Sequence, residues 1–370
     1  MPRLSRIKPV RAATLADVGR AAGVSAMAAS TVLNGARTSS RISEETRQRI
    51  LEAATRLQYR PNATARALVN RRTNAIGVAA VVGDGELNSY ALEVFTGILA
   101  AAGQYDQNTT MFTLHDWSRD AARLHGWCDG RIDGLILLAP VLSREAVKLL
   151  PGHTPFVSLH ANVPAPNVVN IESDEERGAF EMVRHLIAQG HRRIMHLSGN
   201  RGMLGAERRI VGYKRALAQA RIPFSDALFV PASFTSGSGR TALRAWFNAH
   251  AGERLPQAVF CANDALAIDC LETFAEAGLR VPEDVSVAGF DDTLAARTTV
   301  PQLTTMRQPL RAMGGRAVEV LLSRVRRQNG EPAEELENPI VFPVELVTRA
   351  SVGPPPAVDR VVPAARTERG

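Results

Sequence analysis

The sequence predicts an α/β protein in which a small all-α module precedes a longer region of parallel β-sheets covered by helices. Residues 14–60 combine helix-capping residues with apolar positions at helical spacing. From residue 75 onward, continuous apolar runs of strand length, such as Ala75–Val82 and Gly134–Ala139, alternate with helical stretches. Such runs are typical of parallel strands that are buried on both faces. The 370 residues are enough for two or three domains.

The first module has the pattern of a helix-turn-helix. Thr14 can cap a helix, and Asp17 follows at the third position of a capping box. Gly23 ends this helix and supplies the backbone freedom that a tight turn needs. Ser25 then caps a second helix over residues 26–33. In a helix-turn-helix, the second helix enters the major groove of DNA.

The charge of the module favours DNA binding over a plain three-helix bundle. A third helix is predicted after Ser43 and ends near Tyr59. Residues 1–72 contain 14 Lys and Arg but only 4 Asp and Glu, a net charge of +10. The whole chain carries +7, which leaves −3 for the remainder. Basic charge concentrated on one small segment is expected of a module that binds phosphates.

The region from residue 75 to 352 continues the alternation. Further strands are predicted at residues 111–114, 155–159, 194–197, 258–261 and 285–289. Helices are predicted at residues 90–102, 175–189, 208–220, 238–249 and 265–277, with a helical region before Trp127. The length suffices for two lobes. Ligands in such folds bind at the carboxyl ends of strands or between lobes.

Composition argues against metal, cofactor and membrane functions. Cys128, Cys261 and Cys270 are scattered without metal-type spacing, and we interpret them as buried thiols in a reducing compartment. The N-terminus has no apolar run of a signal peptide, and no apolar run reaches the length of a membrane span. We therefore expect a cytoplasmic, nucleoid-associated protein that has no metal site and no cofactor.

Three segments carry a resemblance to a known family. They are TLADVGRAAGVS at residues 14–25, STVLN at 30–34 and YRPN at 59–62. Together they closely resemble the lac repressor family of bacterial transcription regulators, and the resemblance extends to about Val352. It implies an effector domain with the fold of periplasmic sugar-binding proteins. In that fold the chain crosses between two lobes three times.

The resemblance implies the following domain organisation. Residues 1–13 are expected to form a disordered basic arm, 14–60 the helix-turn-helix domain, and 61–74 a hinge helix with its linker. Residues 75–352 are expected to bind effector and to dimerise. In this domain, lobe 1 should contain about 75–168 and 302–328, and lobe 2 about 169–301 and 329–352. The Pro- and Arg-containing residues 353–370 are expected to be a disordered tail.

The DNA-contacting residues are predicted from their positions in the motif. Met27 and Ala26 can offer only apolar contact to bases, whereas Ser and Asn side chains can reach phosphates. The family usually has Thr, Val and Arg where this chain has Ala28, Ala29 and Thr31, which affects the operator sequence. The predicted headpiece contacts are Thr14, Ser25, Ala26, Met27, Ala28, Ser30, Thr31, Asn34 and Asn62.

The stretch PNATARALVN at residues 61–70 resembles the family's hinge helix, which folds when two subunits bind DNA together. The resemblance implies that Leu68 wedges into the minor groove and kinks the operator. Arg66 is a candidate contact to phosphate or to the minor groove. The alternative is an ordinary linker with Leu68 packed on the core. We prefer the wedge.

The family resemblance places six effector contacts at strand ends of the two lobes. They are Ser89, Tyr90, Arg209, Phe234, Asn263 and Asp291. Planar bidentate groups can hold adjacent hydroxyls, and an aromatic ring can cover the C–H face of a sugar. Asp264 and Asp292 are interpreted as helix caps rather than ligands, and Phe234 alone can equally be a core residue.

The resulting interpretation is a homodimeric transcriptional regulator, preferably a repressor, that binds a pseudopalindromic operator and responds to a small molecule. A sugar or sugar derivative is expected as effector, and a purine is the alternative. The C-terminus lacks the leucine heptads of the tetrameric lac repressor, which favours a dimer. Two other classes stay open: an α/β sugar- or nucleotide-processing enzyme with an appended DNA module, and a transport binding protein.

Overall fold

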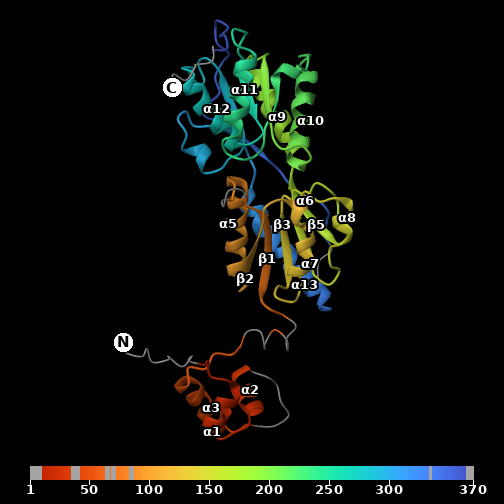
Figure 1. Cartoon of the computed structure of the whole chain (residues 1–370), viewed down its shortest axis with the longest axis vertical. Helices are drawn as coiled ribbons and strands as arrows, with labels where there is room; N and C mark the ends of the chain where they lie inside the picture. The colour runs from red at the N-terminus through yellow and green to blue at the C-terminus, as the bar shows by residue number, and fades with distance from the viewer. Residues whose placement is uncertain are drawn as a thin grey trace, which may run out of the picture. The chain divides into compact units, whose positions relative to one another are not determined.

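The structure is a computed structural model that describes residues 11–34, 42–62, 67, 72–82, 87–332 and 336–363. The chain forms two compact units, Met1–Thr73 and Asn74–Gly370, and each is drawn in Figure 1. Most of the predicted basic arm and of the predicted hinge helix, with Arg66 and Leu68, lies outside the described residues.

The first unit contains the three predicted helices, α1 (Leu15–Ala22), α2 (Ala26–Asn34) and α3 (Glu44–Arg56). The capping box at its start is confirmed, since the Thr14 hydroxyl accepts from the Asp17 amide and the Asp17 carboxylate accepts from the Thr14 amide. Gly23 ends α1 in the left-handed region, at φ 68°.

The core of this unit is small and lies between the three helices. Its buried side chains include Val18 of α1, Ala29 and Val32 of α2, and Ile50 of α3. Helix α1 approaches the turn closely at Gly19, where a Cβ would lie 2.8 Å from the Val24 carbonyl oxygen. The apolar spacing along each helix therefore fixes which face of α2 is buried and which faces solvent.

The first lobe of the second unit is built on a six-stranded parallel sheet with strand order β11-β5-β4-β3-β1-β2. Its strands are β1 (Ala75–Val81), β2 (Asn108–Leu114), β3 (Gly134–Leu138), β4 (Phe156–Leu159), β5 (Val168–Ser173) and β11 (Ile340–Phe342). Its helices are α5 (Ser89–Gln104), α6 (Trp117–Asp120), α7 (Leu124–Trp127), α8 (Arg144–Lys148) and α13 (Leu310–Gln328).

The second lobe has a sheet of order β12-β10-β9-β8-β6-β7, parallel except for the antiparallel edge strand β12. Its strands are β6 (Ile194–Ser198), β7 (Phe229–Pro231), β8 (Ala258–Cys261), β9 (Ser286–Asp291), β10 (Thr304–Arg307) and β12 (Glu345–Val347). Its helices are α9 (Glu175–Ala188), α10 (Leu204–Gln219), α11 (Ser238–Ala249) and α12 (Asp264–Glu276).

Helices cover both faces of each sheet, as the apolar strands predict. Helices α5 and α13 pack on one face of the first sheet, and α6, α7 and α8 pack on the other. In the second lobe, α9 and α10 cover one face and α11 and α12 the other (Figure 1). The carboxyl ends of the parallel strands of both lobes are thereby left open for polar side chains.

The chain crosses between the lobes three times, but each crossing differs from the predicted boundary. Strand β5 completes the first sheet, although lobe 2 was expected to start at residue 169. Strand β10 belongs to the second sheet, although lobe 1 was expected to resume at 302, and β11 returns to the first. Each crossing follows the carboxyl end of a strand. The predicted boundaries place three of these strands in the wrong lobe, because β5 and β10 are partly polar and β11 has only three residues.

The prediction of a disordered tail from residue 353 is wrong for residues 353–363. Val361 forms an antiparallel bridge with Arg254, and the Val362 amide donates to the Glu253 carbonyl. The Val362 side chain is 1% exposed and packs in the core of the second lobe. The buried Val362 side chain and this backbone pairing hold residues 353–363 in place, although the segment has no apolar periodicity.

Candidate effector site and nucleic-acid interface

Several of the predicted DNA contacts lie on an exposed surface of α2 that contains both apolar and polar side chains. Met27 is 80% exposed, and Ser25, Ala26 and Asn34 are exposed beside it. Ala29 and Val32 lie on the opposite face of α2 and are buried in the core of the first unit. Met27 is therefore the one large apolar side chain that α2 offers to a base edge.

Several polar groups predicted to contact DNA also serve the helices themselves. Ser25 Oγ accepts from the Ala28 amide at 3.1 Å, and Thr31 Oγ1 donates to the Met27 carbonyl at 3.0 Å. Asn34 Nδ2 donates to Ser30 Oγ at 3.0 Å. Asn62 is exposed, and the Thr14 hydroxyl is used in the capping box. These bonds orient the side chains on the exposed face.

A cavity between the two lobes gathers five of the six predicted effector contacts. Tyr90 lies on the first-lobe side, and Arg209, Phe234, Asn263 and Asp291 lie on the second-lobe side. Ser89 begins α5 and does not line the cavity. The full lining is Asn88, Tyr90, Ala139, His160, Glu175, Met203, Leu204, Gly205, Arg209, Phe234, Asn263 and Asp291.

The strand ends explain why these residues meet. Ala139 and His160 directly follow β3 and β4, and Asp291 is the last residue of β9. Asn263 follows β8 and caps α12, where its Oδ1 accepts from the Leu266 amide at 3.0 Å. Its Nδ2 faces the Phe234 carbonyl at 3.4 Å. Parallel strands bring all these carboxyl ends to one edge of each sheet.

Arg209 is the only lysine or arginine among the described residues that line this cavity, and it is buried. Its Nη2 donates to Glu175 Oε1 at 3.0 Å and lies 3.8 Å from Asp291 Oδ1. Its Nη1 donates to the Ala262 carbonyl. The guanidinium carbon lies 4.0 Å from the centroid of the Phe290 ring. The charge is thus held by two carboxyl groups and an aromatic face.

A chain of hydrogen bonds crosses the cavity from the first lobe to the second. Tyr90 Oη lies 2.6 Å from His160 Nδ1, and His160 Nε2 accepts from the Ser173 amide at 3.2 Å. Ser173 Oγ donates to Gln308 Oε1 at 2.5 Å, and Gln308 Nε2 donates to Asp291 Oδ1 at 2.6 Å. Ser173 ends β5 and Gln308 follows β10, so both lie where the chain crosses between lobes.

The Ser173 amide and hydroxyl both lie within hydrogen-bond distance of His160 Nε2, at 3.2 and 3.3 Å. The amide can only donate to Nε2, whereas the hydroxyl can accept from it, so both tautomers of the neutral ring find a partner at Nε2. In either tautomer, His160 Nδ1 and Tyr90 Oη share one hydrogen bond. Burial lowers the pKa of His160, in agreement with a neutral ring, and raises the pKa of Tyr90 well above its ordinary value.

Two buried polar atoms of the cavity have no partner among the described residues. They are Glu175 Oε2, an acceptor, and Arg209 Nε, a donor. Unpaired buried polar atoms are costly. A ligand that both donates and accepts hydrogen bonds would satisfy both atoms.

Three residues of the lining have left-handed backbone conformations without being glycine. They are Ala139 at φ 44°, His160 at φ 54° and Asp291 at φ 122°. Such conformations are strained and tend to gather at functional sites. The volume open to the centre of a water molecule is about 60 Å3.

Sequence reasoning missed Glu175 and His160. Glu175 begins a helix, where an acidic residue has a sufficient explanation in the helix dipole. His160 follows a strand of only four residues. The sequence feature related to Glu175 is the glycine-rich stretch GNRGMLG at residues 199–205. A Cβ at Gly205 would lie 2.7 Å from Glu175 Oε1. The glycines of the GNRGMLG stretch allow this close packing, as Gly199 does beneath the Phe234 ring.

The proposed helix-capping roles of Asp264 and Asp292 are wrong. Asn263 caps α12, and Asp264 instead accepts from the Thr293 amide at 2.7 Å and from Thr305 Oγ1 at 2.6 Å. Asp292 pairs with the guanidinium groups of Arg307, Arg349 and Arg297. Both side chains are buried and stabilise the second lobe beside the cavity.

An ion pair joins the lobes next to the cavity. Arg208 Nη1, on α10 of the second lobe, donates to Glu172 Oε1, on β5 of the first, at 2.8 Å. Glu172 is buried, and its other oxygen accepts from Asn170 at 2.8 Å. Arg208 is therefore an interlobe contact and not merely a surface neighbour of Arg209.

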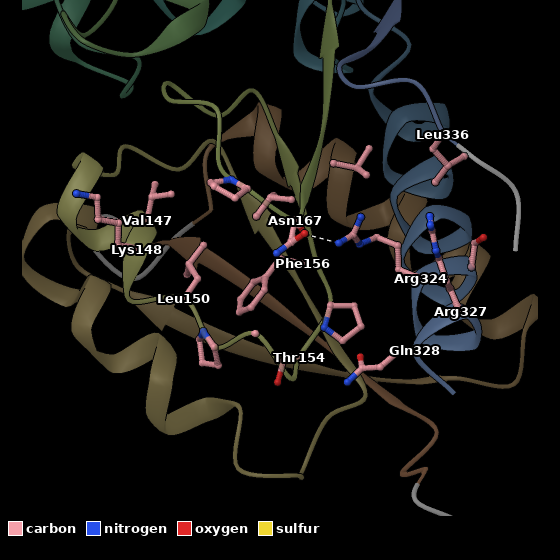
Figure 2. A pocket seen from close by; sticks show the side chains of 17 residues that line it. Val147, Lys148, Leu150, Thr154, Phe156, Asn167, Arg324, Arg327, Gln328 and Leu336 are labelled. Carbon is pink, nitrogen blue, oxygen red and sulfur yellow. Dashed lines mark hydrogen bonds between the residues drawn. The ribbon is translucent and has the colours of Figure 1, made fainter. Parts of the chain in front are cut away.

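A larger cavity, of about 770 Å3, lies within the first lobe (Figure 2). It is lined by the first residues of β4 and β5, Phe156 and Val168, and by the last turns of α13. Figure 2 shows Arg324 of α13 reaching toward Asn167. These are the amino ends of the strands, whereas ligands of parallel α/β folds bind at the carboxyl ends. The interlobe cavity is therefore the candidate effector site.

Within the described ranges, no cluster of three or more His, Cys, Asp or Glu side chains could hold a metal ion. The three cysteines are buried free thiols. No helix of the described part of the chain is long and apolar enough to span a membrane.

The fold and the site define a DNA-binding regulator with a two-lobed ligand-binding domain. Residues 14–62 match the lacI family of bacterial regulatory proteins, and residues 183–352 match a periplasmic binding protein-like domain. The HTH-type transcriptional repressor PurR of Aliivibrio fischeri (strain MJ11) is 32% identical over 345 residues, which cover 92% of this chain and 98% of the relative. The HTH-type transcriptional regulator DegA of Bacillus subtilis (strain 168) is 29% identical, with coverage of 92% and 98%.

Two solved structures share the fold. The lac repressor dimer bound to operator and the anti-inducer ONPF superposes with a TM-score of 0.79 at 26% identity, covering 93% of this chain and 100% of the other. The transcriptional regulator CelR in complex with cellobiose gives a TM-score of 0.65 at 28% identity, with coverage of 92% and 99%.

The chain belongs to the lacI family of bacterial regulatory proteins. It is a DNA-binding transcriptional repressor with a ligand-binding domain, and the enzyme alternative is wrong because its relatives are transcriptional regulators.

Replacing the neighbouring Asp291 and Asp292 by asparagine should change the stability of the chain at pH 8 in opposite directions. Burial raises the pKa of Asp291 to about 8, although Arg209 lowers it. The folded chain then binds a proton that the unfolded chain releases, so stability falls as pH rises from about 4 to about 8. Asp291→Asn keeps the acceptor for Gln308 and removes this penalty. We expect a gain of about 1 kcal/mol, or roughly 2–4 °C in Tm, at pH 8 and no gain at pH 4.

Asp292→Asn is the matched control, because Asn also tolerates its φ of 57°. Burial alone would raise the pKa of Asp292, but hydrogen bonds from Arg307 and Arg349 lower it. Its stabilising effect is present at neutral pH and is lost in acid. Asp292→Asn should therefore lower Tm at pH 8. Thermal unfolding of both variants across pH 4–8 checks the pair, and a loss of stability in Asp291→Asn at every pH would contradict the assignment.

Proposed function

We propose that this chain acts as a homodimeric repressor whose operator affinity is controlled by a small polyhydroxylated ligand bound between the lobes. The observation that carries the proposal is the hydrogen-bond chain from Tyr90 to Asp291, which passes through two of the three crossing segments. A ligand that bonds to Tyr90 and Asp291 touches both lobes at once. Its binding energy then depends on how the lobes are arranged.

The chemistry of the cavity supports a sugar or sugar derivative. Arg209, Asn263 and Asp291 offer donors and acceptors in fixed positions, and the Phe234 ring lies 5.5 Å from the Arg209 guanidinium carbon. The relative CelR was solved with cellobiose, which agrees with this class. A purine, which is planar and also combines donors with acceptors, is the second candidate.

The switch we propose is a change in the relative arrangement of the lobes. The Arg208–Glu172 ion pair joins the two lobes. The Ser173–Gln308 hydrogen bond joins two of the segments at which the chain crosses between the lobes. A ligand that favours one arrangement shifts the population toward it, and its effect on operator affinity must be reciprocal. Two hinge helices, each with Leu68 in the minor groove, would transmit the arrangement to DNA.

The dimer is proposed from an exposed apolar stripe on α5. Leu92 is 54% exposed and Leu99 is 48% exposed, and they lie two turns apart on the same helix face. Phe95 lies between them along the chain and is only partly buried. A second copy of this chain would cover the stripe, and the lac repressor that shares the fold was solved as a dimer.

Met27 should contribute to sequence-specific DNA binding but little to non-specific binding. Once an operator has been selected from random DNA with the wild-type protein, Met27→Ala should weaken operator binding by roughly tenfold. Binding to unrelated DNA, which depends on phosphate contacts, should change less than about twofold. Fluorescence anisotropy titration measures both affinities.

Leu51→Ala, at an exposed position of α3, is the control and should leave both affinities unchanged. An equal loss in operator and non-specific binding on Met27→Ala would mean that Met27 does not read base edges.

Charged residues on the α5 stripe should separate the dimer. We expect the Leu92→Arg/Leu99→Arg double variant to sediment as a monomer of about 40 kDa at micromolar concentration, because the new charges would be buried without partners. Sedimentation velocity gives the mass directly. Leu149→Arg places the same charge on another exposed leucine, in the first lobe after α8, and should stay dimeric. A double variant that remains dimeric would show that the subunits meet elsewhere.

A further inference from the structure

We propose that Glu175 makes the interlobe cavity selective for an uncharged, polyhydroxylated effector and excludes its acidic and phosphorylated counterparts. This inference rests on the proposed function, since it specifies which ligands the same cavity accepts. It assigns a specificity-determining role to a residue outside the six contacts that the sequence predicted.

The Glu175 carboxylate is fixed in the wall of the cavity. It is the first residue of α9 and is 1% exposed. Its Oε1 accepts from Arg209 Nη2 at 3.0 Å. The close approach of α10 at Gly205, where a Cβ would lie 2.7 Å from Oε1, leaves the side chain little space to turn away. The negative charge therefore stays at the cavity.

Among the described residues that line the cavity, Arg209 is the one cation paired with this carboxylate. His160 Nε2 lies 3.5 Å from Glu175 Oε1, but burial lowers the pKa of His160, so the ring is neutral and adds no positive charge. Arg208, the next arginine along α10, is paired with the buried Glu172. Arg209 is therefore the cationic partner of Glu175 in the cavity.

The one guanidinium of the cavity is already engaged. Arg209 donates to Glu175 and to the Ala262 carbonyl, and Asp291 lies 3.8 Å away. The Phe290 ring covers one face of the group. An incoming carboxylate or phosphate would have to compete with Glu175 for Arg209 while it faces the Glu175 charge at close range. Like charges juxtaposed in a buried site are strongly unfavourable.

An uncharged polyol fits the same atoms. Among the described residues, no donor pairs with Glu175 Oε2 and no acceptor pairs with Arg209 Nε. A hydroxyl group can supply either, since it donates one hydrogen bond and accepts two. The phenol of Tyr90 and the side-chain amide of Asn263 add polar groups from opposite lobes. A ligand with several hydroxyls thus satisfies the cavity without adding charge.

The test compares neutral sugars with matched anions on the full-length protein. The neutral probes are glucose, galactose, ribose and cellobiose. The anions are glucuronate, galacturonate, glucose 6-phosphate and ribose 5-phosphate, and hypoxanthine and guanine form a separate purine arm. Thermal shift screens the panel, because a ligand at a hundred times its Kd adds about 2.7 kcal/mol of stability. Calorimetric titration then gives the Kd of each hit and of its charged counterpart.

For the wild-type protein we expect the neutral sugar to bind more than about tenfold tighter than its acid or phosphate. Glu175→Gln keeps the shape of the side chain and an acceptor for Arg209 but removes the charge. It should reduce the preference to less than about threefold, mainly by improving the affinity for the anion. Glu176→Gln, at a neighbouring position whose carboxylate pairs with the exposed Arg215, should leave the preference unchanged.

Each contrary result has a distinct meaning. An anion that binds wild-type protein as tightly as its neutral counterpart overturns the inference, whether or not Glu175→Gln folds. An unchanged preference in folded Glu175→Gln overturns the role of Glu175. Binding of a purine alone overturns the polyhydroxylated class but keeps small-molecule control. If no probe binds or alters operator affinity, the proposed function itself fails.

Discussion

The burial of the Arg209 guanidinium is the interaction on which the ligand-binding unit depends. A buried charge is tolerated only when it is paired and hydrogen-bonded. Arg209 meets this requirement through Glu175, the Ala262 carbonyl and Asp291. These partners come from the start of α9 and from the carboxyl ends of β8 and β9. The guanidinium therefore connects the start of α9 with the ends of two neighbouring strands of the second lobe, at the edge that faces the first lobe.

The cost of this arrangement suggests a role other than stability. Well-packed apolar side chains often stabilise a core as well as a buried ion pair does. The cluster is instead incomplete, because one acceptor of Glu175 and one donor of Arg209 have no partner within the described part of the chain. The strained backbone at His160 and Asp291 lies at the same place. These features together are typical of a site prepared for a ligand that completes its hydrogen bonds.

The parts that were predicted from sequence have strong local signals. The capping box at Thr14 and the apolar strands of both sheets depend on neighbouring residues, and both are present in the structure. The resemblance to the family led to Arg209 and Asp291, which line the interlobe cavity. Glu175 escaped because an acidic residue at the start of a helix is already explained by local electrostatics. Its neighbours His160 and Gly205 are 15 and 30 residues away in sequence and meet it only in the folded chain.

Weak local signals also explain the wrong boundaries. Strand β10 is short and contains two buried threonines, and the segment around Val362 is held by one buried valine and by pairing with residues 253–255. Such contacts between distant segments cannot be inferred from periodicity. The crossing segments have the same property, since Ser173 and Gln308 are 135 residues apart and share a buried hydrogen bond.

The central claim is that ligand in the interlobe cavity and operator on the headpiece are coupled through the arrangement of the lobes. The most direct measurement is a thermodynamic cycle on the full-length protein. The operator Kd is measured with and without saturating ligand, and the ligand Kd with and without saturating operator. We expect the same factor in both directions, at least about fivefold, as linkage requires. Ligand binding that leaves the operator Kd unchanged would contradict it.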